Sequence, residues 1–276
     1  MNEHRVSTMT VRFLAATANL GCCSPGGARH ISAADAWADD AVARCLDLLF
    51  LQEVPSRDWL ERFSSSYSVH IAEPVESHPK WCRSAVVVRR DAIASELLVL
   101  PTENYHGTYL AGAVLDLAGV GPVALVSVHA SPNPSTDADK RRWSGQPPAE
   151  RRGGGRNAGA LWDVDFVVET LRLLACDQDV LAVGDFNESR RWDTTHPGET
   201  WGAEFFESVG TAGFVDCLER LWGEERATRG DHQIDHVLAT PAVAERVTFA
   251  AVSEPSSVPG VEPSDHRPVE FEVAVV

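Results

Sequence analysis

The chain has 276 residues and a formal net charge of −16, and 44% of its residues are hydrophobic. This length and composition allow one large domain or two small ones with a sizeable core. The acidity argues against a non-specific binder of long nucleic acids, because such proteins neutralise phosphates with a basic face. No apolar run reaches the length of a membrane span, and the N-terminus does not resemble a signal peptide, so we expect a cytoplasmic location.

The cysteines also limit the possible functions. The chain has six of them, and none forms a Cys-x-x-Cys pair, which argues against a zinc ribbon. Cys45 and Cys176 lie in apolar helical patterns, so we expect both to be small core residues. Without an export signal, a reducing compartment is the default expectation.

The predicted elements follow one another as alternating strands and helices. Apolar, β-branched runs predict strands over 11–18, 48–51, 85–89, 111–117, 123–129, 180–183, 236–239 and 269–275. Helical spacing predicts helices over 33–45, with Ser32 as N-cap, and over 57–63, 157–175 and 204–212. This order predicts an α/β (α+β) fold: a four-layer sandwich of two mixed β-sheets packed face to face, with helices outside.

Nothing along the chain resembles an interdomain linker. We therefore expect a single domain over residues 10–276, preceded by a flexible tail over residues 1–9. The long polar stretch 132–156 is better explained as a functional or mobile loop, and further irregular stretches cover 188–201 and 254–263.

Short polar motifs end six of the apolar runs. They are Thr17-Ala18-Asn19, Leu51-Gln52-Glu53, Val128-His129-Ala130-Ser131, Gly184-Asp185-Phe186-Asn187, Ile234-Asp235-His236 and Ser264-Asp265-His266. Buried polar groups without partners cost free energy, so this pattern indicates one shared polar site. Carboxylates, amides and imidazoles together are the groups used in metal-assisted attack of water on a phosphate ester.

Asp185 and Asn187 lie two residues apart at the end of one predicted strand. If the strand direction continues, both side chains point to the same side, with Phe186 opposite. We expect Asp185 to orient or deprotonate the attacking water and Asn187 to donate to a phosphoryl oxygen. An Asx turn after a buried strand is the structural alternative.

His266 and Asp235 form the second expected catalytic group. His266 is expected to donate to the phosphate or to act as a base on water, and a carboxylate such as Asp235 would fix its tautomer. Asp265 then becomes a second ligand of the metal or of metal-bound water. Asn19 is expected to bond a metal-bound water or to hold Glu53, so we assign Asn19, Glu53 and Asp265 to the metal site.

The motifs ending in Glu53, Asn187 and His266, in this order, resemble those of the endonuclease/exonuclease/phosphatase (DNase I-like) superfamily. The resemblance spans about residues 10 to 276. It implies an enzyme, a phosphoester hydrolase that is either a phosphodiesterase or nuclease or a phosphatase, with Mg²⁺ or Mn²⁺ as cofactor. It also implies that Glu53 is the principal metal ligand and that His129 contacts phosphate and helps the leaving oxygen depart. His236 stands where the family usually has an aromatic residue, which leaves the substrate class open.

A cluster of basic residues lies in the loop that follows His129. We expect four of them to bind the substrate's phosphate or an adjacent anionic part: Arg141, Arg142, Arg151 and Arg152. Trp143 is expected to stack on a base or to cover an apolar group. A solvated, disordered loop is the alternative.

The expected partner is a phosphate-ester substrate: a nucleic acid, a nucleotide or a phospholipid headgroup. No obligate protein partner is evident from the sequence. The acidic charge favours a small substrate, whereas the basic loop favours nucleic acid. A non-catalytic binding protein that keeps the fold is the alternative, and such a protein would be expected to lack at least one of Glu53, Asp185, Asn187 and His266, all of which are present.

Overall fold

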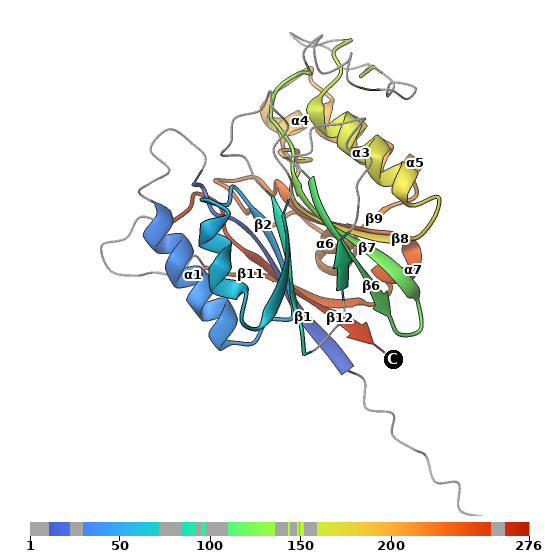
Figure 1. Cartoon of the computed structure of the whole chain (residues 1–276). Coiled ribbons are helices and arrows are strands. Elements are labelled where there is room, and N and C mark those ends of the chain that lie inside the picture. Colours follow the sequence, from blue (N-terminus) through green and yellow to red (C-terminus); the bar gives the residue numbers. More distant parts are fainter. Residues whose placement is uncertain are drawn as a thin grey trace, which may run out of the picture.

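Two six-stranded sheets form the inner layers of the molecule (Figure 1). The structure is a computed structural model that describes residues 11–22, 30–71, 84–91, 95–97, 110–135, 143, 148, 150–151, 159–254 and 263–275. The first sheet contains, in spatial order, β11 (Val247–Val252), β12 (Val269–Val275), β1 (Val11–Asn19), β2 (Leu48–Gln52), β4 (Ala85–Arg89) and β3 (Tyr67–Ile71). The second contains β5 (Ser95–Leu97), β6 (Leu110–Leu117), β7 (Gly121–His129), β8 (Asp179–Asp185), β10 (Asp235–Ala239) and β9 (Val215–Asp216).

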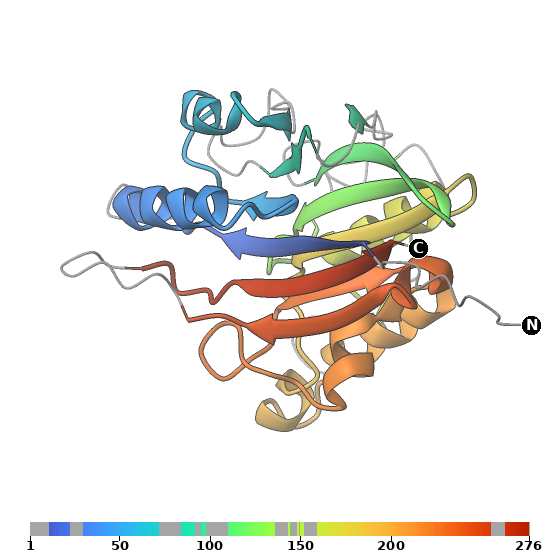
Figure 2. The ribbon, with the colours of Figure 1, turned by 90° about the horizontal axis from the view of Figure 1, so that it is seen from below.

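Both sheets are mixed, as expected. The pairs β1–β2 and β7–β8 are parallel, whereas the other neighbouring strands are antiparallel. The two sheets face each other across one hydrophobic core, to which Phe50 and Phe271 contribute from the first sheet and Leu125 and Val183 from the second. All four side chains are almost fully buried. The stacked arrangement is visible from a second direction in Figure 2.

Helices cover the outer faces of both sheets (Figure 1). The first sheet packs against α1 (Ile31–Ala43) and the 3-10 helix η2 (Asp58–Phe63), and the second against α3 (Asp163–Leu174) and α5 (Trp201–Thr211). The shorter helices are α4 (Trp192–Thr195), α6 (Cys217–Trp222) and α7 (Pro241–Ala244). The central strands are therefore buried on both faces, which explains why their sequences are continuously apolar. The predicted four-layer sandwich is confirmed.

Each of the eight predicted strands is present, but four further strands were not predicted. These are β3, β5, β9 and β11, which are short or lie at or next to a sheet edge. Alternation of apolar and polar residues does not mark these segments clearly. They become strands mainly because they pack against a neighbouring strand, and less because of intrinsic preference. The expected tail over residues 1–9 lies outside the described residues.

The predicted start of α3 is wrong for residues 159–162. Trp162 has an extended backbone (φ −99°, ψ 156°), and the Asp165 carboxylate accepts a hydrogen bond from its N–H, so the helix begins at Asp163. Helix α1 likewise begins at Ile31, after His30, so Ser32 lies inside the helix and does not cap it.

Two cysteine predictions are also wrong. Cys45 and Cys176 are exposed, because each directly follows its helix and lies in the turn beyond it. Within the described ranges, no helix combines the length and apolarity required to cross a membrane.

Candidate active site

The residues that form the site lie side by side because of the register of three neighbouring strands. His129 at the end of β7 pairs with Asp185 at the end of β8, and Asp185 pairs with Asp235 at the start of β10. In the opposite sheet, Asn19 pairs with Gln52, so Glu53 follows one residue beyond the strand end. The strand ends of both sheets therefore meet at one edge of the sandwich, as the polar motifs predict.

Asp185 lies at the centre of this cluster and is almost completely buried. Its Oδ2 accepts a hydrogen bond from Asn19 Nδ2 (3.0 Å), and it lies 3.7 Å from His266 Nε2 and 3.9 Å from His129 Nε2. Its Oδ1 accepts a hydrogen bond from the Asn187 N–H (2.9 Å). Burial raises the pKa of Asp185, and the charges of the two imidazoles only partly oppose this shift.

Glu53 brings a second carboxylate to the same place from the first sheet. Its Oε1 accepts a hydrogen bond from Asn19 Nδ2 (3.3 Å) and lies 3.6 Å from His129 Nε2, while 17% of the side chain stays exposed. The amide oxygen of Asn19, its metal-binding atom, accepts a hydrogen bond from Gly21 N–H (3.0 Å). Of the two roles expected for Asn19, this orientation favours holding Glu53 over bonding a metal-bound water.

His266 and Asp235 form a buried pair, as expected for an imidazole whose tautomer a carboxylate fixes. His266 Nδ1 lies 3.0 Å from Asp235 Oδ2. Burial opposes the charged form of His266, but the carboxylates of Asp235 and Asp185 outweigh it and raise the pKa of His266 to about 9. Burial similarly opposes ionisation of Asp235, yet His266 lowers the pKa of Asp235 overall. The pair is thus a hydrogen-bonded imidazolium carboxylate at neutral pH.

Asn187 has a left-handed backbone conformation (φ 52°) directly after β8. The Asx turn named as the structural alternative does form, because Asp185 accepts from the Asn187 N–H, and it turns the Asn187 side chain toward the strand ends. Asn187 Nδ2 donates to the Ala130 carbonyl (2.7 Å), while Phe186 packs on the opposite side in the core beneath α5. Glu53 shares this uncommon backbone region (φ 50°), which for non-glycine residues often marks functional sites.

Gln52 links the two sheets beneath the site. Its amide donates to Ser127 Oγ of the second sheet (2.9 Å) and accepts from Thr17 Oγ1 of the first (3.1 Å). Gly184 lies against this amide: a Cβ there would stand 2.7 Å from Gln52 Nε2 and 2.2 Å from the Val128 carbonyl oxygen. No role was predicted for Gln52, although a glutamine at the end of an apolar strand is a detectable signal for a buried polar contact.

His236, the departure from the family pattern, also lies beneath the site. It is fully buried, its Nε2 donates to the Glu188 carbonyl (2.9 Å), and its Nδ1 lies 3.4 Å from Asp216 Oδ2. His236 therefore fixes the backbone directly after Asn187.

The expected role of Arg151 in substrate binding is wrong. Its side chain is only 4% exposed, and its guanidinium lies 2.9 Å from Asp165 and 2.7 Å from Glu188. Two buried carboxylates therefore bind this guanidinium in the place where a phosphate was expected. Trp143 is likewise buried and packs on Phe166 of α3 (ring centroids 5.2 Å apart), so it does not stack on substrate. The other three arginines expected to bind substrate lie outside the described residues: Arg141, Arg142 and Arg152.

Asp265 lies at the rim of the site. Its side chain is 60% exposed and forms an ion pair with Arg229 (2.8 Å), and its Oδ1 lies 4.0 Å from His266 Nε2. It is close enough to join the cluster, but in this arrangement Arg229 binds its carboxylate.

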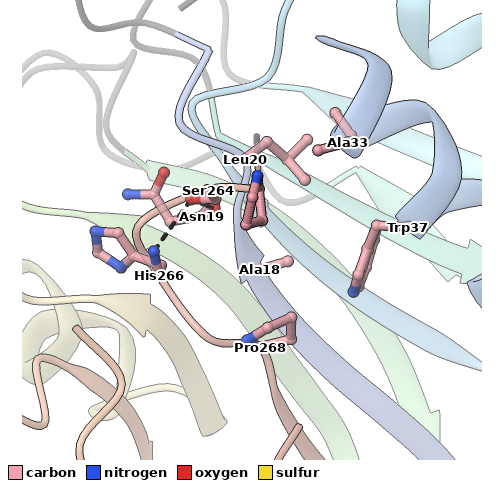
Figure 3. Close-up of a pocket in the computed structure, with 10 residues that line it drawn as sticks. Ala18, Asn19, Leu20, Ala33, Trp37, Ser264, His266 and Pro268 are labelled. Atoms are coloured by element: carbon pink, nitrogen blue, oxygen red, sulfur yellow. Dashed lines mark hydrogen bonds between the residues drawn. The ribbon is translucent and has the colours of Figure 1, made fainter. Parts of the chain in front are cut away.

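Two hollows adjoin the cluster. A small one of about 30 Å³ lies between α1 and the end of β1, with Asn19, Ser264 and His266 on one side and Trp37 on the other (Figure 3). Its size suits a single water molecule. A larger cleft of about 510 Å³ opens beside Asn187 and Asp265.

Comparison with known proteins gives a family and a set of similar folds. A family model described as "Endonuclease/Exonuclease/phosphatase family" matches residues 16–266. A search of curated proteins finds no match.

Three solved structures illustrate the structural likeness. An AP endonuclease from Leishmania major has a TM-score of 0.65 at 13% identity, covering 95% of this chain and 87% of that chain. The 3′ phosphatase NExo from Neisseria, bound to a product DNA hairpin, has a TM-score of 0.60 at 16% identity, covering 95% and 99%. D. rerio TDP2, complexed with a single-strand DNA product, has a TM-score of 0.57 at 14% identity, covering 95% and 98%. At these identities the likeness establishes the fold.

Proposed function

Because the chain belongs to the endonuclease/exonuclease/phosphatase family, we propose that it is a divalent-metal-dependent phosphoester hydrolase. The observation that carries this proposal is the convergence on Asp185 of side chains from both sheets. Asn19 bonds the carboxylates of Asp185 and Glu53 together, and His129 and His266 approach the same Asp185 oxygen. Two imidazoles and two carboxylates thus gather at this edge of the sheets, and among them Glu53 is the most exposed.

The donor set fits a hard cation such as Mg²⁺ or Mn²⁺. Glu53 offers a partly exposed carboxylate, whereas Arg229 already binds the Asp265 carboxylate at the rim. Among the described residues, no three His, Cys, Asp or Glu side chains form a site that holds a metal by protein atoms alone. An open site with one or two carboxylates, completed by water, is the arrangement that Mg²⁺ usually takes. A cation held by Glu53 would polarise the phosphoryl group and neutralise its developing charge.

Asp185 is the proposed general base. Its raised pKa makes it a stronger base than an ordinary aspartate, and hydrogen bonds from Asn19 and Asn187 hold its carboxylate in one orientation. Asp185 takes a proton from the attacking water and aims that water in line with the leaving oxygen.

His266 is the proposed donor to the phosphate. With a pKa of about 9 it is protonated at neutral pH, so it stabilises negative charge on a phosphoryl oxygen instead of acting as the base. Asp235 holds the ring by its Nδ1 and leaves Nε2 directed into the site. Asn187 and His129 are the proposed further contacts to the phosphate, with His129 on the leaving-group side.

A phosphate ester that includes a nucleotide or nucleic acid is the proposed substrate. Two of the similar structures hold DNA products, which supports this choice. A cytoplasmic location is part of the proposal, and the free thiols of the four described cysteines, Cys22, Cys45, Cys176 and Cys217, support a reducing compartment.

The test is Mg²⁺-dependent release of nitrophenol from bis(p-nitrophenyl) phosphate. We expect Glu53→Gln and Asp185→Asn each to lower kcat at least about 100-fold, because each removes a charge from the reaction centre. Asp179→Asn is the matched control: Asp179 begins the same strand β8 at its opposite end, and we expect this variant to keep its activity. Hydrolysis that survives both site changes would refute the assignment, and Mg²⁺ binding without any hydrolysis would support the non-catalytic alternative.

A further inference from the structure

The cleft of about 510 Å³ beside Asn187 and Asp265 has the size of a small-molecule site. Because two site residues line it, a group bound in the cleft would lie next to a phosphate held in the site. The cleft wall also contains Trp192, His232 and Arg229, which the proposed hydrolysis does not use.

Two aromatic rings form one wall of this cleft. Trp192 of α4 and His232 have ring centroids 5.8 Å apart and planes inclined at 72°. Both side chains are partly exposed, and Trp192 lies in the irregular stretch that follows Asn187. A half-buried tryptophan beside a phosphate site provides a flat apolar surface on which a planar ring can stack.

The charges of the cleft distinguish between planar and cationic ligands. Arg229, 47% exposed, donates from Nε to Asp265 Oδ2 (2.8 Å) and neutralises that carboxylate. A quaternary ammonium headgroup would approach the Arg229 guanidinium and would find no free carboxylate in Asp265, so it is disfavoured in spite of the aromatic wall. A neutral planar ring with an adjacent phosphate fits both Trp192 and Arg229.

We propose that this cleft binds the nucleoside base of a phosphodiester substrate, with Trp192 as the stacking surface that selects it. The inference rests on the proposed hydrolase function and names its substrate class. Substrate recognition was expected from the basic loop, but Trp143 and Arg151 of that loop are buried. In this proposal, the segment after β8 recognises the substrate instead. Trp192 is thus a specificity-determining residue.

Two chromogenic diesters with the same leaving group test this proposal. Thymidine 5′-(p-nitrophenyl) phosphate carries a nucleoside, whereas methyl p-nitrophenyl phosphate carries a methyl group in its place. We expect the wild-type kcat/KM to be higher for the nucleoside ester and Trp192→Ala to lower the ratio of the two values about tenfold or more, since base stacking is lost. Trp192→Phe should keep most of the ratio. Phe249→Ala, which removes an exposed aromatic ring from β11, is the control and should leave both rates unchanged.

The outcomes separate this inference from the proposed function. Failure to hydrolyse either diester would overturn both proposals. Hydrolysis of both with a ratio near one, or a ratio that Trp192→Ala does not change, would overturn only the nucleoside cleft. Preference for p-nitrophenyl phosphorylcholine over both would overturn it in favour of a lipid headgroup.

Competition experiments identify the source of the nucleoside. Thymidine monophosphate and a single-stranded oligothymidylate should both inhibit hydrolysis of the nucleoside ester, and both should inhibit Trp192→Ala less. Tighter inhibition by the oligothymidylate would assign a nucleic-acid strand as the substrate, and equal inhibition would assign a mononucleotide ester. Inhibition that is the same in wild type and variant would contradict the cleft assignment.

Discussion

The chemistry of the site is decided at single residues that have several partners each. Asp185 is approached by an amide, a backbone N–H and two imidazoles while it is almost fully buried. Burial makes its carboxylate more basic, whereas the carboxylates of Asp235 and Asp185 keep His266 charged against the effect of burial. In the proposed mechanism, these displaced pKa values give the two groups opposite tasks, with Asp185 as base and His266 as donor.

Glu188, next to Asn187, is a residue whose titration should affect stability. Burial raises the pKa of Glu188 from its ordinary value of 4.5 to about 7, although Arg151 opposes the shift. The folded state thus holds this proton more tightly than the unfolded state does. The protonated Glu188 therefore contributes to the stability of the folded state in full below pH 4.5, and this contribution is lost as the pH rises through 7. A pKa shift of this size corresponds to about 3 kcal/mol.

We therefore expect the free energy of unfolding of Glu188→Gln to fall less between pH 4.5 and 8 than that of wild type, by up to about 3 kcal/mol. Urea unfolding across this pH range measures the difference. Glu169→Gln, which changes a more exposed carboxylate paired with Arg172, should keep the wild-type pH dependence. Parallel curves for wild type and Glu188→Gln would contradict the prediction.

At the scale of elements, the strand ends position the site residues. The side chain of Gln52 links the two sheets and holds the strand ends of one sheet against those of the other. Gln52 at the end of β2 bonds Ser127 of β7, and β8 passes so close to it that only glycine fits at position 184. Gly184 also has a positive φ of 141°, which side chains disfavour. The end of β8 can therefore carry Asp185 next to the first sheet only through this glycine.

We expect Gly184→Ala to destabilise the protein by about 3 kcal/mol or more, because its methyl group would overlap the Val128 carbonyl oxygen. Gly210→Ala is the matched control, because Gly210 lies in α5 with open space around it and should gain about 0.5–1 kcal/mol as alanine. Thermal and urea unfolding of both variants measure the difference. Equal stability of the two variants would show that the close approach of β8 is not required.

At the scale of the whole molecule, a net charge of −16 coexists with a site that we propose to bind an anionic substrate. The carboxylates of Glu53 and Asp185 come from different sheets and repel each other, with Asn19 and His129 between them. A divalent cation would relieve this repulsion in the folded state only, since the unfolded chain separates the two residues. Cation binding should therefore stabilise the whole fold.

We expect Mg²⁺ at about ten times its Kd to stabilise the protein by about 1.4 kcal/mol. This corresponds to a rise in Tm of roughly 3 °C, measured by differential scanning fluorimetry. Glu53→Gln should lose most of this rise, whereas Glu61→Gln, which changes an exposed carboxylate of η2, should keep it. An undiminished rise in Glu53→Gln would place the cation elsewhere.

The sequence by itself determined the strands of the core, the polar motifs at their ends and, from these, the family. Those features are local: apolar runs predict buried strands, and residues two positions apart, such as Asp185 and Asn187, remain close in any fold. The edge strands depended on packing between distant segments, whereas the start of α3 and the exposure of Cys45 and Cys176 followed from where the helices begin and end.

Only the tertiary structure decided which polar side chains lie in the site and which pair with other groups outside it. Arg151 looked like a surface cation in sequence, but Asp165 and Glu188 neutralise it in the interior, whereas Trp192 came to line the cleft. The sequence shows which residues are charged or aromatic. The partner of a buried charged group, however, comes from another segment of the chain. Whether the group is buried with that partner or exposed decides whether it can bind a ligand.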